Sequence, residues 1–97
     1  MLHESAKPVN GDPATLALAA LGWILADRER AERYLDLTGL DPDALRAGLE
    51  EKTVLASALE FLENHEPDMI RAAEALAITP EELAAARAAL AERNPIE

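Results

Sequence analysis

The sequence predicts an all-α protein, a compact bundle of about six short helices wrapped around an apolar central helix. Alanine, the strongest helix former, supplies a large share of the apolar residues. The alternation of β-branched and aromatic residues that marks strands is missing. Several prolines directly follow Asp or Thr, which is the pattern expected where a capped helix begins.

The central helix is expected from Pro13 to about Ala26, because residues 14–26 carry no charge. Its large residues fall on two faces, so neighbouring helices should bury most of it, including Trp23. The run is shorter than the roughly 20 residues of a membrane span. It also lacks the positive leader and cleavage site of a signal peptide. Gly22 weakens the helix. We interpret its presence as a sign that another backbone approaches the helix closely at this position.

A chain of 97 residues is expected to form one domain. Residues 1–11 are polar and contain proline and glycine, so they are expected to be a flexible leader. Residues 12–93 are expected to be the single helical domain. Asn94 and Pro95 stop the last helix, which makes residues 94–97 a C-terminal tail.

Capping residues place the second helix at residues 28–38, between Asp27 as N-cap and Gly39 as the left-handed residue after its end. Oppositely charged residues four apart, such as Glu29 and Arg33, predict ion pairs on its outer face. This face is interpreted as a solvated, salt-bridged surface.

The next three helices follow from similar signals. Asp41 should cap a third helix that runs to about Glu51, and Thr53 should begin a fourth. The fourth helix is very apolar and should pack directly against the central helix. Glu66 and the proline after it start a fifth helix, with Ile70 among its inward residues.

The sixth helix has the clearest beginning. Residues 79–82, Thr-Pro-Glu-Glu, form a full capping box with proline at the first helical position, and the helix should run to about Arg93. The corner before it, residues 78–83, repeats the pattern of residues 40–45. We interpret the two segments as helix-turn-helix-like corners that flank the core.

These corners raise the question of DNA binding, in which the second helix would enter the major groove. Both second helices, however, begin with acidic residues. The whole chain carries 19 acidic and 9 basic residues, for a net charge of −10. Carboxylates repel phosphates, so no nucleic-acid partner is expected. A degenerate helix-turn-helix protein associated with DNA stays as an alternative function.

No enzyme chemistry, cofactor or metal site is expected. The chain has no glycine-rich phosphate loop and no nucleophile elbow. It has no cysteine, which excludes disulfides and thiolate zinc sites and suits a reducing, cytoplasmic compartment. One acidic stretch matches no metal motif and is interpreted as a solvated helix end. It comprises Glu60, Glu63, Asn64, His65, Glu66 and Asp68.

The expected function is therefore a non-enzymatic protein-interaction domain, an adaptor or regulator. A small homo-oligomeric structural protein is a further alternative. The candidate interaction face lies on the alanine-rich sixth helix, where alanines extend beyond what Leu83 and Leu90 can bury. This face contains Ala85, Ala88, Ala89 and Glu92. It would bind an unidentified protein partner or a second copy of the chain, and no membrane.

Four segments also carry a resemblance to known sequences. They are Ala20-Leu-Gly-Trp-Ile-Leu-Ala, Leu37-Thr-Gly-Leu-Asp-Pro, Phe61-Leu with Glu66-Pro67 following, and Ile78-Thr-Pro-Glu-Glu-Leu. In these segments the chain, from about Pro13 to Leu90, resembles a family of short bacterial proteins of unknown function. The resemblance implies a compact helical protein, cytoplasmic, with no assigned activity and no known site residues.

Overall fold

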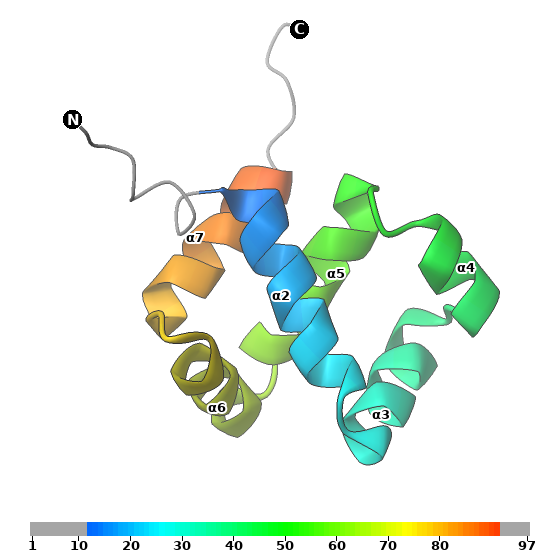
Figure 1. Cartoon of the computed structure of the whole chain (residues 1–97), viewed down its shortest axis with the longest axis horizontal. Helices are drawn as coiled ribbons and strands as arrows, with labels where there is room; N and C mark the ends of the chain where they lie inside the picture. Colours follow the sequence, from blue (N-terminus) through cyan, green and yellow to red (C-terminus); the bar gives the residue numbers. More distant parts are fainter. Residues whose placement is uncertain (1–11, 92–97) are drawn as a thin grey trace, which may run out of the picture.

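The computed structural model describes residues 12–91, which form six α-helices joined by short turns (Figure 1). The helices are α2 (Pro13–Leu25), α3 (Arg28–Thr38), α4 (Pro42–Ala47), α5 (Lys52–Glu63), α6 (Glu66–Leu76) and α7 (Pro80–Ala91). The all-α class is confirmed. The expected leader (1–11), the tail (94–97) and residues 92–93 lie outside the described residues.

The centre of the fold is formed by α2, α5 and α7, each of which packs against the other two. The predicted packing of α5 on α2 is confirmed. In Figure 1, α6 and α7 lie on one side of α2, and α3 and α4 lie on the other. Buried alanines on all three central helices allow their axes to approach closely. These alanines are Ala17, Ala20, Ala56, Ala58 and Ala86.

The large residues of α2 are not all buried. Leu16, Leu21 and Ile24 belong to the core, whereas Leu18 is 48% exposed and Leu25 is 38% exposed. The expectation that neighbouring helices bury most of α2 is therefore wrong for Leu18 and Leu25. The reason is that α4 and α2 flank a groove here instead of packing together.

Trp23 is partly buried and packs against the core, so the expected burial of its side chain holds only in part. The guanidinium of Arg30 lies 3.6 Å from the centroid of the Trp23 ring, and its Nη2 donates to the Trp23 carbonyl. A cation stacked on an aromatic face is a stabilising arrangement. Arg30 therefore belongs partly to the packing of α2 on α3, and not to a fully solvated face.

Local capping explains where α3 and α4 begin and where α3 ends. The Asp27 carboxylate accepts a hydrogen bond from the Arg30 amide at 3.0 Å, and Gly39 has a φ of 77° after the end of α3. Asp41 caps α4 through the Ala44 amide at 2.7 Å. All of these caps were predicted, because each depends on residues only a few positions apart.

α4 ends at Ala47, instead of near Glu51 as expected. Gly48 is buried, and a Cβ atom at this position would lie 2.7 Å from Cγ2 of Val54. The chain turns here, with the Glu51 amide donating to the Gly48 carbonyl at 2.9 Å. α5 then begins before Thr53, which lies in the first turn and is not the cap.

Tyr34 is the largest fully buried side chain and joins α3 to α5. Its hydroxyl is hydrogen-bonded to the Ser57 hydroxyl at 2.8 Å, and its ring meets the edge of Phe61 at a centroid distance of 5.6 Å. Burial raises the pKa of Tyr34, and the hydrogen bond to Ser57 acts in the opposite direction.

The second corner, like the first, has a left-handed residue after one helix and a proline at the start of the next. Ala77, with a φ of 61°, takes the left-handed position that Gly39 takes after α3. The Ile78 amide donates to the Ala73 carbonyl at 2.9 Å, which closes the helix end. On α6 itself, Ile70 is 44% exposed, so its predicted inward position is wrong.

The predicted capping box of α7 is confirmed. The Glu82 amide donates to Thr79 Oγ1 at 3.0 Å, and the Thr79 amide donates to Glu82 Oε1 at 2.8 Å.

We expect Thr79→Ala to lower the free energy of unfolding by about 1 kcal/mol, because one amide loses its acceptor. Thr79→Ser keeps the hydroxyl and should stay close to wild type. Equal urea midpoints for Thr79→Ala and wild type would contradict this.

Among the helices of residues 12–91, none is long and apolar enough to cross a membrane.

Candidate interaction groove beside α2

An apolar groove of about 330 Å³ lies between α2 and the α3–α4 corner. Its lining residues come from three helices and from the turn after α4, and most are leucines. They are Leu25, Leu35, Pro42, Leu45, Arg46 and Leu49. Arg46 alone carries a charge among them, and it pairs with Asp43 at 3.0 Å on the exposed side of α4.

A second depression of about 220 Å³ continues along α2 towards its beginning. It is lined by Ala14, Thr15, Leu18, Leu49, Glu50 and Leu55. Leu49 lines both depressions, so they meet at this side chain. We call the two together the α2–α4 groove.

One wall of the α2–α4 groove is the exposed stripe of α2. Residues three and four positions apart lie on the same side of a helix, so Ala14, Leu18, Gly22 and Leu25 form one row. Gly22 is exposed, and beyond its neighbours and its own helix backbone no atom of residues 12–91 lies within 4 Å of the position that its Cβ would occupy. The interpretation of Gly22 as a close approach within the chain is therefore wrong.

Along the first depression the opposite wall is α4, which lies at the edge of the molecule (Figure 1). Along the second depression it is the turn after α4 together with Leu55 of α5. Leu45 is 7% exposed and anchors α4 to the core. Gly48, which packs against Val54, fixes the turn after it. Because these contacts hold α4 beside α2 and not over it, Leu18 and Leu25 stay accessible.

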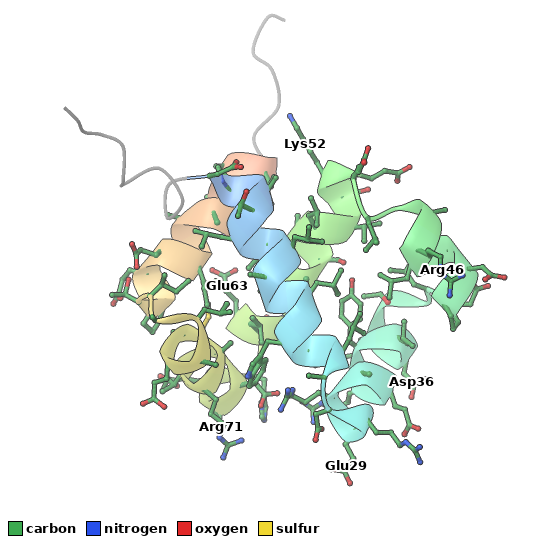
Figure 2. All side chains as sticks on the ribbon, in the orientation of Figure 1. Glu29, Asp36, Arg46, Lys52, Glu63 and Arg71 are labelled. Atoms are coloured by element: carbon green, nitrogen blue, oxygen red, sulfur yellow. The ribbon has the colours of Figure 1, made fainter. Side chains whose placement is uncertain are left out.

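The segment that supplies α4 and the turns beside the groove is acidic overall. Between residues 35 and 55 the chain has five acidic and two basic side chains. Figure 2 shows Asp36 on α3 and Arg46 on α4 at this side of the molecule, with Lys52 extending from the start of α5. A leucine-lined groove formed in part by an acidic segment has the chemistry of a binding site for an apolar segment with basic flanks.

A separate charged cluster surrounds Asp68, which is buried at the start of α6. Its Oδ2 atom accepts from Arg33 Nη2 at 2.5 Å and lies 3.0 Å from Nδ1 of His65, and its Oδ1 atom lies 3.8 Å from Arg71. The prediction that this acidic stretch is a solvated helix end is wrong for Asp68, which is buried. Arg33 was expected to pair with Glu29, but instead it joins α3 to α6.

The other members of the acidic stretch do not combine into a metal site. Glu63 pairs with Arg87 of α7 at 2.6 Å, so it joins α5 to α7. Within residues 12–91, no group of three or more histidine and carboxylate side chains could hold a metal ion. Within this stretch, Asp68 and Glu63 are the carboxylates that the described ion pairs use to connect helices.

The comparison with protein families identifies the relatives of this chain. Residues 10–93 match a family described as "Protein of unknown function (DUF3572)". The chain belongs to this DUF3572 family. The matched region contains all six described helices and both walls of the α2–α4 groove. No curated protein and no solved structure matches the chain.

The face predicted on the last helix of this DUF3572 member is a different surface. Ala85, Ala88 and Ala89 are exposed on α7, and Glu92 lies outside the described residues. In Figure 1, α7 and α4 lie on opposite sides of α2, so the α7 face is remote from the groove. The alanine face offers only methyl groups, whereas the groove offers several leucines. The α7 face stays a prediction, and the groove is the candidate that sequence reasoning missed.

Proposed function

We propose that this member of the DUF3572 family is a non-enzymatic protein-interaction domain, with an adaptor or regulatory role. It binds an apolar helical segment of a protein partner in the α2–α4 groove. The observation that supports this most is the exposure of Leu18 and Leu25 beside apolar depressions. Contiguous apolar surface on a small monomer marks interaction sites. A cytoplasmic setting is part of the proposal, and the absence of cysteine is consistent with it.

The shape of the groove favours a helix as the bound segment. From Ala14 to Leu25, the α2 wall extends about 16 Å at 1.5 Å per residue, which matches about three turns of a partner helix. Helices bound in grooves use apolar anchors at positions such as i, i+4 and i+7. The leucines on both walls provide complementary surface for such anchors. The net charge of −10 argues against nucleic acid as the partner.

The test is a neutral substitution of the two exposed leucines. A partner captured with the wild-type chain from its native host is purified, and its Kd is measured against variants. We expect Leu18→Gln/Leu25→Gln to weaken binding at least about tenfold, because apolar area is lost without a change of charge. Glutamine is a good helix former, so circular dichroism should stay close to wild type.

Leu37→Gln is the matched control, because Leu37 is 74% exposed on α3 and does not line the groove. It should bind as wild type does. A double variant that binds normally would contradict the groove. If Ala85→Glu/Ala89→Glu abolishes binding instead, the α7 face is the interaction surface. Concentration-dependent self-association without a heterologous partner would favour the homo-oligomeric alternative.

A further inference from the structure

The row of residues on the exposed face of α2 contains Gly22. Neither a close contact nor a left-handed φ within the described residues requires a glycine at this position. Glycine in a helix interior is less favourable than alanine. Gly39 adopts a left-handed φ of 77°, and the missing side chain of Gly48 leaves room for Val54. At Gly22 the backbone is helical, and among the described residues a Cβ would meet no atom within 4 Å outside its own stretch of helix. Alanine would therefore fit the free protein without a clash.

Gly22 occupies the middle of the surface to which the proposed function assigns binding. It lies between Leu18 and Leu25 on the same row of α2, and these leucines line the two depressions of the groove. A residue without a side chain between two large ones leaves a notch on the helix surface. Where two helices cross, the side chains at the contact set the distance between their axes. The notch would allow a second helix to approach α2 closely.

We propose that Gly22 is the point where a helix of a partner protein crosses α2, and that this helix is amphipathic with basic residues on its flanks. The inference rests on the proposed function and adds the position of the crossing and the chemistry of the partner. Leu18 and Leu25 pack on either side of the crossing. The apolar face of the partner helix fills the groove towards Leu45 and Leu49.

Charge selects this occupant over a second copy of the chain. Residues 35–55, the segment that supplies α4 and the turns beside the groove, carry five acidic and two basic side chains, and each copy carries −10 overall. Two such chains repel each other, whereas a basic helix is attracted and correctly oriented. An anionic membrane surface is disfavoured for the same reason.

The probe is a fluorescein-labelled amphipathic peptide of about 18 residues, long enough for about five helical turns. Its apolar face carries leucines and its flanks carry lysines. A matched peptide has glutamates in place of the lysines. Fluorescence anisotropy with the full chain gives the Kd of each. We expect the lysine peptide to bind at least about tenfold more tightly than the glutamate peptide, and more weakly as salt is added.

Substitutions at Gly22 should change stability and binding in opposite directions. Gly22→Ala should raise the thermal unfolding midpoint, because alanine favours the helix and nothing lies near its methyl group. The same variant should weaken binding of the lysine peptide about fivefold, because the methyl group fills the notch. Gly22→Leu should weaken it further. A merely structural glycine would not produce this combination.

The outcomes separate the two proposals. If Gly22→Ala binds like wild type while Leu18→Gln/Leu25→Gln binds poorly, the groove is used and the crossing point is wrong. If neither variant changes the Kd, both the groove and the crossing fail. Equal or tighter binding of the glutamate peptide overturns the basic partner, and so does the absence of binding by both peptides. If the wild-type chain dimerises and Gly22→Ala abolishes the dimer, the notch binds a second copy of the chain instead of a partner helix.

Discussion

Arg33→Met is expected to lower the free energy of unfolding by about 2–3 kcal/mol, because it leaves a buried carboxylate without its main partner. Asp68 has a side chain only 4% exposed, and Arg33 Nη2 donates to it at 2.5 Å. Methionine keeps an apolar stem beside Phe61, over which the guanidinium lies at 5.3 Å from the ring centroid. The expected loss is below that of a fully buried pair, since the Arg33 side chain is 46% exposed.

A double-mutant cycle isolates this pair from general packing effects. Asp68→Ala added to Arg33→Met removes the uncompensated charge, so the double variant should lose less stability than the sum of the single variants. Urea denaturation of the four proteins measures this. Glu29→Gln is the control, because it removes the surface partner that the sequence suggested for Arg33. It should change stability by no more than about 0.5 kcal/mol. A larger loss from Glu29→Gln than from Arg33→Met would refute the assignment.

Gly48→Ala is expected to lower the free energy of unfolding by about 2 kcal/mol, through overpacking at the end of α4. The new Cβ would lie 2.7 Å from Cγ2 of Val54 and 3.3 Å from the Ala44 carbonyl oxygen. Val54 is buried, and its β-branched side chain has few alternative rotamers, so the backbone must move. A shift of α4 would also change the wall of the α2–α4 groove.

The cause of this effect can be tested by making room for the methyl group. Val54→Ala removes Cγ2, so Gly48→Ala should cost less stability in the Val54→Ala background than in the wild type. Gly22→Ala makes the same chemical change on an open helix surface and should raise stability instead. If Gly48→Ala and Gly22→Ala give the same shift of the urea midpoint, the close contact at Gly48 is not a constraint.

Helix positions were largely predictable because their signals are local. Asp27, Asp41 and Thr79 each bond to a backbone amide three residues later, so the residue types alone identify these helix starts. The end of α4 was not predictable in this way. It depends on whether Gly48 fits against Val54, a contact that forms only after α5 has packed. Thr53 was wrongly predicted to begin α5 for the same reason, because a good capping residue acts as a cap only where the chain turns.

The candidate site was less predictable than the helices. Sequence reasoning selected Ala85, Ala88 and Ala89 by assuming that the apolar residues of α2 would be covered. Whether Leu18 and Leu25 are covered depends on where α4 lies, and α4 is positioned by Leu45 and Gly48. The sequence does not distinguish an apolar residue that faces the core from one that faces a groove. The α2–α4 groove was therefore not predicted.

The sequence by itself determined the helical class, the capped corners and the acidic character of this DUF3572 member, because composition and short-range hydrogen bonds decide these properties. Only the tertiary structure decided which charges are buried and which leucines stay exposed. Asp68 meets Arg33 across 35 positions of sequence. Across the groove, Leu25 faces α4, and Leu18 faces the turn after α4 and the start of α5. Such contacts depend on how helices pack in three dimensions, and the energy of each group depends on the neighbours that this packing supplies.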